Sequence, residues 1–148
     1  MVDAMAIQKN VTWDSSKQKF IGYVDIGNGQ CSDQQASEVL VILINSILDK
    51  WKQPLAYFLT KGMSGGSLAQ ILRDTIELME SINIRIVTIT CDGDAKNQAA
   101  LKILGLQPRL RKGVIDHPSN NNWKIYVFYD ACHMLKLIRN TFKHCAMR

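Results

Sequence analysis

The sequence predicts one α/β domain in which antiparallel strands come first and βα units follow. Apolar residues make up 47% of the 148-residue chain, which is enough for a single buried core. The first sixty residues hold strand-like runs without a helical pattern between them, whereas helical and strand patterns alternate afterwards. We therefore expect a mixed sheet flanked by helices, which excludes a helical bundle and a β-sandwich.

Three strands are expected before the first helix. Residues 17–26 alternate imperfectly between apolar and polar side chains, and the polar segment 27–33 predicts a loop. The run 39–48 is apolar and β-branched, which favours a buried strand, although a helix of the same composition is an alternative. The segment 51–60 follows after a short turn, and Pro54 within it suits an edge or a strand start.

The next part of the chain alternates between helix and strand. Ser67 is placed to cap a helix, because apolar residues recur at helical spacing over 68–82. The β-branched run 84–91 is typical of a strand covered on both faces. Asp94 can then cap a short helix that ends at Gly105.

The last forty residues begin with a connection over 105–122 and a strand over 123–129. A basic helix is expected from about Ala131. We expect its apolar stripe to pack on the sheet and its basic side chains to be exposed. The stripe consists of Leu135, Ile138, Phe142 and Cys145.

The positive charge of the chain gathers near its C-terminal end. Residues 1–108 hold 10 lysines or arginines and 11 acidic residues, whereas residues 109–148 hold 8 and 2. Such asymmetry indicates a polyanionic partner, with a solubilising surface as the alternative. The chain shows no signal-peptide pattern and no apolar run near the roughly 18 residues of a membrane span, so we expect neither secretion nor membrane insertion. The four cysteines form no CxxC pair and are expected to be reduced.

Asp92 is the residue that most strongly suggests chemistry. It directly follows the strand-like run 84–91, and ligands of open α/β sheets gather beyond the carboxyl ends of strands. A carboxylate there suits Mg²⁺, although a turn shared with Asp94 is a structural alternative. Asp3 could supply a second carboxylate for a two-metal site, but taken alone it is a residue near a chain end.

Asp130 ends the last predicted strand and His133 follows it, so both are auxiliary candidates at the same sheet edge. The polar side of the final helix could contact phosphate groups. We assign that role to Lys136, Arg139 and Lys143, with a solvated helix face as the alternative.

Six segments occur in an order that matches one known family. They are DAMAI (3–7), FIGYVDIG (20–27), WKQPLAYFLTKG (51–62), TCDGDAKN (90–97), LKILG (101–105) and DACHMLKLIRN (130–140). Over nearly its whole length the chain resembles the RNase H-like catalytic domain of P-element-type transposases, including those with an N-terminal THAP domain. The patterns CDG-x3-N and D-x-CHMLKLIRN are the most specific of these.

The resemblance implies an RNase H-like mixed sheet and a nuclear enzyme that cuts and joins transposon DNA. It implies an acidic triad with Mg²⁺, or Mn²⁺ in its place, and self-association of the full-length protein. Asp3 matches the first acidic residue and Asp92 the second. The third is a glutamate that follows an insertion domain in the family, and no glutamate follows Glu80 here. We therefore expect 1–148 to be a partial domain, with most of the first strand and the third acidic residue outside it.

Two further functions stay open from the sequence. One is a non-catalytic nucleic-acid-binding or interaction domain derived from a transposase, and the other is a small-molecule α/β domain unrelated to DNA. If the transposase interpretation holds, Asp3 and Asp92 should lie on adjacent strands with their carboxylates facing each other. The isolated chain should bind DNA weakly and cleave it poorly, because a third ligand helps to fix both metal ions.

Overall fold

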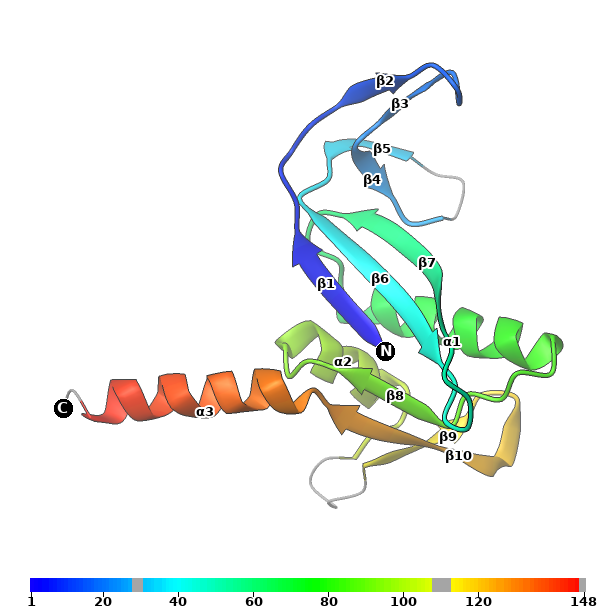
Figure 1. Ribbon diagram of the computed structural model, residues 1–148, viewed down its shortest axis with the longest axis vertical. Coiled ribbons are helices and arrows are strands. Elements are labelled where there is room, and N and C mark those ends of the chain that lie inside the picture. Colours follow the sequence, from blue (N-terminus) through cyan, green and yellow to red (C-terminus); the bar gives the residue numbers. More distant parts are fainter. Residues whose placement is uncertain (28–30, 108–112, 147–148) are drawn as a thin grey trace. The chain divides into compact units, whose positions relative to one another are not determined.

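The computed structural model describes residues 1–27, 31–107 and 113–146 (Figure 1). The side chains of residues 31, 121 and 144–146 lie outside the description. The chain divides into two compact units, Met1–Met63 and Ser64–Arg148. Among the described residues, no helix is both long and apolar enough to cross a membrane.

The first unit is built around a five-stranded antiparallel sheet with the order β1-β6-β7-β4-β5. Its strands are β1 (Val2–Ala6), β4 (Tyr23–Asp25), β5 (Cys31–Gln35), β6 (Glu38–Asn45) and β7 (Lys52–Thr60). The strands β6 and β7 confirm the predictions for 39–48 and 51–60. They form a hairpin with an irregularity between Ile42 and Leu43.

The expected strand over 17–26 is two strands, because the backbone turns sharply at Gly22. The φ angle of Gly22 is +107°, a conformation that only glycine adopts readily. A Cβ at this position would overlap the carbonyl oxygen of Asn10 and lie 3.0 Å from its carbonyl carbon. The chain therefore leaves β3 (Lys19–Ile21) and enters β4 through a point at which two backbone segments touch.

The loop predicted for 27–33 is wrong over its last three residues. Cys31 begins β5, whose residues pair with β4 in the order Tyr23 to Gln35 and Asp25 to Cys31. The side chains of this strand are mostly polar, so its apolar pattern is weak. The segment 31–35 is a strand because its backbone pairs with β4. Such pairing cannot be recognised from the segment's own sequence.

The second unit contains a mixed three-stranded sheet with the order β8-β10-β9. The strands β8 (Thr88–Cys91) and β10 (Asn120–Tyr129) are parallel, and β9 (Val114–His117) is antiparallel to β10. Helices α1 (Gly65–Ser81) and α2 (Ala95–Ile103) pack against each other. Antiparallel strands followed by βα units confirm the predicted fold class.

Apolar residues of α1, of α2 and of the sheet strands are buried in the second unit. Its buried residues include Leu68, Leu72, Ile76 and Met79 of α1, Leu101 of α2, and Ile89, Ile115 and Ile125 of the strands. This set confirms the helical periodicity predicted over 68–82. The helix nevertheless begins earlier than predicted, because Ser64 is its N-cap and the Ser67 amide donates to the Ser64 hydroxyl at 3.0 Å.

Two other boundaries differ from the sequence prediction. The regular strand within 84–91 starts only at Thr88. The connection predicted for 105–122 contains β9 and the start of β10, apart from residues 108–112, which lie outside the described part. The short strand β9 was missed because its pairing partner lies in β10, where Ile125 pairs with Ile115.

A buried histidine links three elements of the second unit. The side chain of His117 on β9 has no exposed area, and its ring meets the Trp123 ring edge-on at 5.6 Å. Its Nε2 lies 3.4 Å from the Glu80 carboxylate of α1, and its Nδ1 accepts from the Ser119 amide. The guanidinium group of Arg85 lies over the Trp123 ring, with its central carbon 4.9 Å from the ring centre.

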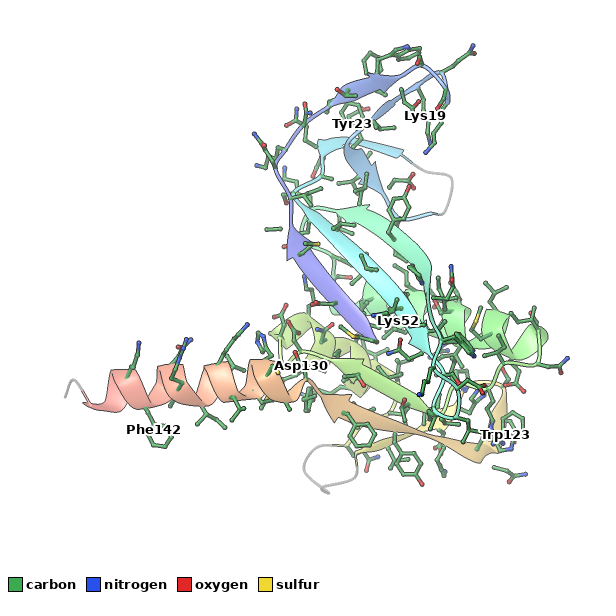
Figure 2. All side chains as sticks on the ribbon, in the orientation of Figure 1. Lys19, Tyr23, Lys52, Trp123, Asp130 and Phe142 are labelled. Atoms are coloured by element: carbon green, nitrogen blue, oxygen red, sulfur yellow. The ribbon has the colours of Figure 1, made fainter. Side chains whose placement is uncertain are left out.

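Helix α3 (Ala131–Ala146) begins where predicted, but its apolar stripe does not pack as predicted. Leu135, Ile138 and Phe142 are 65%, 49% and 69% exposed. Figure 2 shows Phe142 projecting outward from the helix, which continues from the end of β10. Met134 and Leu137, on a neighbouring face, lie beside Gly93 in the loop after β8, since a Cβ added to Gly93 would come within 3.3 Å of Met134 Sδ and 3.6 Å of Leu137 Cδ1.

Candidate functional site

Two carboxylates lie at one edge of the mixed sheet in the second unit. Strand β8 ends at Cys91 and the parallel strand β10 ends at Tyr129, and these two residues are register partners. The next residue on each strand is an aspartate, Asp92 and Asp130. The Asp130 amide donates to the carbonyl oxygen of Cys91 at 2.8 Å, so the strands leave the sheet side by side. This is the carboxyl edge, where α/β proteins bind ligands.

Hydrogen bonds to one of its oxygens hold the Asp92 side chain. Its Oδ1 accepts from the Asp94 amide at 3.0 Å and from Nδ2 of Asn97. Asn97 lies in the first turn of α2 and is only 7% exposed, so its amide is held in place by packing. Both bonds go to the same oxygen, so they fix the orientation of this half-buried carboxylate.

The expected roles of the two neighbouring aspartates are partly reversed. Asp94 occupies the N-cap position of α2 as predicted, but its carboxylate makes no capping hydrogen bond. The turn before the helix is instead stabilised by the carboxylate of Asp92. The role of Asn97 was not predicted from the sequence, although Asn97 is the last residue of the CDG-x3-N pattern and its fixed spacing from Asp92 is a signal in the sequence.

Asp130 has a clear structural role at the start of α3. Its Oδ1 accepts from the Cys132 amide at 3.0 Å, and its carbonyl accepts from the Met134 amide at 2.9 Å. This is the arrangement of an N-capping aspartate. His133 lies in the same first turn and is partly buried. An auxiliary role of either side chain toward a metal or a substrate stays a prediction.

The thiol of Cys91 is not a nucleophile at neutral pH. Burial raises the pKa of Cys91 to about 11, and the neighbouring Asp92 carboxylate adds to the rise. The residue is 4% exposed and belongs to the sheet core. Its place beside Asp92 is therefore a packing position, in which the residue acts as a small buried hydrophobe.

Asp3 lies on β1 in the first unit. It is paired with Val41 of β6, it is exposed, and its Oδ1 accepts from the amide of Ala4 at 2.9 Å. Asp3 belongs to the first unit and Asp92 to the second. That their carboxylates face each other stays a prediction. Within the described residues, no group of three or more His, Cys, Asp or Glu side chains could together hold a metal ion.

Helix α3 presents its basic residues to solvent. Lys136, Arg139 and Lys143 are all exposed, as predicted. No acidic residue occurs between Ala131 and Ala146, so the helix carries unbalanced positive charge. The side chain of Cys145, the fourth member of the predicted apolar stripe, lies outside the described part of the structure.

Comparison with known proteins identifies the family of this chain. The family described as TNP-like, RNase H N-terminal domain, matches residues 1–105. The chain belongs to this family. It is 32% identical over 149 residues to the human DNA transposase THAP9. This alignment covers 97% of the chain and 16% of that relative. It is also 29% identical over 104 residues to the transposable element P transposase of Drosophila melanogaster, which covers 70% of the chain and 13% of the relative.

A solved structure gives the same relationship. The Drosophila P element transposase in its strand transfer complex matches with a TM-score of 0.71 and 25% identity, over 94% of this chain and 27% of that chain. The resemblance to P-element-type transposases and the RNase H-like fold class predicted from the sequence are thereby confirmed. The chain spans well under a third of the length of each of these relatives.

Proposed function

We propose that the chain contributes to the catalytic core of a nuclear DNA transposase that cuts and joins phosphodiester bonds with divalent metal ions. The observation that carries this proposal is Asp92 at the carboxyl end of β8, with its orientation fixed by the buried amide of Asn97. The similarity to two transposases and to a strand transfer complex supports DNA as the substrate.

Asp92 and Asp3 are the residues proposed to hold the metal. Carboxylate oxygens are the ligands that Mg²⁺ and Mn²⁺ prefer, and the Asn97 amide orients the Asp92 carboxylate. The chemistry that these ions supply is stabilisation of charge on the attacking and leaving oxygens of the phosphodiester. Because the described residues offer no three-ligand group, we expect the chain alone to hold the ions loosely.

The basic face of α3 is proposed to contact the DNA backbone. Lys136, Arg139 and Lys143 are exposed and have no acidic neighbour on the helix. Contacts with phosphate groups release counterions, so affinity should fall steeply as salt rises, with a slope near −0.9 per contact for duplex DNA. Self-association, if it occurs, is proposed for the full-length protein.

Three measurements on the wild-type chain and the Asp92→Asn variant test this function. Calorimetry should detect weak Mg²⁺ binding that Asp92→Asn abolishes. Duplex DNA should bind weakly, with a steep salt dependence that is the same in both proteins. A plasmid-nicking assay in Mg²⁺ and in Mn²⁺ should show little or no cleavage.

The possible results separate the competing functions. Salt-dependent DNA binding without any Mg²⁺ binding would favour a non-catalytic domain derived from a transposase. Failure to bind DNA at any salt concentration would favour a domain unrelated to DNA and refute the proposal. Robust nicking that disappears in Asp92→Asn would prove the chain a complete nuclease, and Asp130→Asn would then show whether Asp130 supplies the third carboxylate.

A further inference from the structure

The first unit carries a small hairpin that is separate from its five-stranded sheet. Strand β2 (Thr12–Asp14) pairs with β3 (Figure 1). This pairing places Trp13 directly opposite Phe20. The two rings meet edge to face, with centroids 5.1 Å apart and planes at 69°. Trp13 is 54% exposed and Phe20 is 59% exposed. Two large aromatic side chains thus stand together on one face of a hairpin with much of their ring surface open.

The base of this hairpin is held against the rest of the unit by a close backbone approach and a hydrogen bond. The hairpin returns to β4 through Gly22, whose backbone touches the carbonyl of Asn10 at the start of the hairpin. The carbonyl of Gly22 in turn accepts from the Ala36 amide at 2.9 Å, which joins it to the segment after β5. The aromatic pair is therefore presented from a fixed base rather than from a free loop.

The residues around the aromatic pair are predominantly basic. Lys9, Lys17 and Lys19 are exposed, and the only acidic residue between positions 9 and 21 is Asp14. The Asp14 carboxylate accepts from the amide and hydroxyl of Ser16 and from the Lys17 amide, which shapes the hairpin tip. The hairpin therefore combines open aromatic faces with a net charge of +2.

We propose that the β2–β3 hairpin binds unpaired nucleotides of DNA, with bases stacked on Trp13 and Phe20 and phosphate groups contacting Lys17 at the hairpin tip. Aromatic side chains beside lysines form the surfaces on which single strands bind, because every base offers a flat face. Bases inside a duplex are already stacked on both sides, so only unpaired ones can use the rings. The net positive charge of the hairpin favours a polyanionic partner such as a DNA strand.

This inference rests on DNA as the substrate of the proposed function, but it concerns a different part of the chain from the acidic site. Binding at the hairpin involves neither Asp3 nor Asp92 and needs no metal ion. The hairpin lies wholly within the first unit. The two proposals can therefore fail separately.

The test measures binding of the full chain to fluorescein-labelled oligo(dT) and to a duplex of equal length, by fluorescence anisotropy without divalent metal. Trp13→Leu retains an apolar side chain but removes the aromatic face, and we expect it to weaken oligo(dT) binding about 5- to 100-fold. Trp13→Phe should restore most of the affinity. Lys17→Gln should lower the salt slope for the single strand by about 0.7.

A structural control uses the opposite face of the same hairpin. Ile21 is 38% exposed and points away from the aromatic pair, so Ile21→Ala should leave oligo(dT) affinity unchanged. An oligonucleotide with 5-iododeoxyuridine should crosslink under ultraviolet light to the peptide that contains Trp13 or Phe20.

Several results would overturn the inference while the proposed function stands. Equal oligo(dT) affinity of wild type and Trp13→Leu, with duplex binding intact, would show that the rings do not contact bases. An equal loss for duplex and single strand in Trp13→Leu would contradict the preference for unpaired nucleotides. A dimer in sedimentation that Trp13→Leu dissolves would instead assign the aromatic face to a second copy of the chain.

Discussion

Replacement of Gly22 by alanine should destabilise the first unit far more than the same replacement at Gly62. Both glycines belong to this unit and both have positive φ angles, +107° and +74°. An alanine in such a conformation costs about 1–2 kcal/mol. A Cβ on Gly62 would meet no atom within 4 Å, so this strain is its whole cost.

At Gly22 a steric cost adds to the backbone strain. The new Cβ would overlap the Asn10 carbonyl oxygen and lie 3.2 Å from the Cα of Val11. Both neighbours are backbone atoms, so relief requires movement of the chain at the base of the hairpin. Forced overpacking of this kind costs about 1–3 kcal/mol, which raises the expected loss for Gly22→Ala to about 2–5 kcal/mol.

Urea denaturation followed by circular dichroism gives the free energy of unfolding of both variants. The reduced entropy of the unfolded chain affects both alanine variants alike and cancels in the comparison. Gly22→Ala should also weaken oligo(dT) binding, because the base of the hairpin moves. Equal unfolding free energies for the two variants would refute the close backbone approach at Gly22.

Three further outcomes are expected in the second unit. Asn97→Ala should reduce the free energy of unfolding by about 1.5–3 kcal/mol and Mg²⁺ affinity about 10- to 100-fold, because it removes the donor that orients the acidic site. The buried Cys91 thiol should resist iodoacetamide at pH 8, while the exposed Cys132 thiol reacts. The free energy of unfolding should fall as pH rises from 9.0 toward about 11, because the Cys91 thiol ionises at a lower pH in the unfolded chain than in the folded one. His117→Ala should cost about 2–5 kcal/mol, because it empties a fully buried site.

Each of these outcomes has a direct check. Gln98→Ala removes an exposed side chain that bonds the Gly93 carbonyl, so calorimetry should find Mg²⁺ affinity unchanged; an equal loss would contradict the role of Asn97. Peptide mass mapping compares the two thiols, and labelling of Cys91 as fast as Cys132 would contradict its burial. A loss below about 1 kcal/mol for the histidine variant in urea would show that His117 is not packed as described.

The strongest sequence predictions concerned long periodic segments. The apolar runs that became β6 and β7 and the helical spacing that became α1 each carried enough buried residues to be recognised alone. The polar strand β5 and the short strand β9 could not be found in this way, because their stability comes from pairing with β4 and β10.

The candidate site was predictable in its residues but not in its hydrogen bonds. Asp92 was identified because it follows a β-branched run, and Asp130 because it ends a strand. That Asn97 holds Asp92, and that Asp130 caps α3, depends on how α2 and β10 leave the sheet edge. The stripe on α3 was misjudged because periodicity shows which side chains share a face but not whether another element covers that face.

The sequence by itself determined the α/β class, the family and the acidic residue at the end of β8. These properties depend on local residue patterns and on the order and spacing of short motifs along the chain, both of which can be recognised without coordinates. Tertiary structure decided which amide orients Asp92, which cysteine has its pKa raised by burial, and that Trp13 and Phe20 contact each other while both stay exposed. Each of these depends on residues distant in the chain or on solvent exposure, and both are set only when the strands pair and the helices pack.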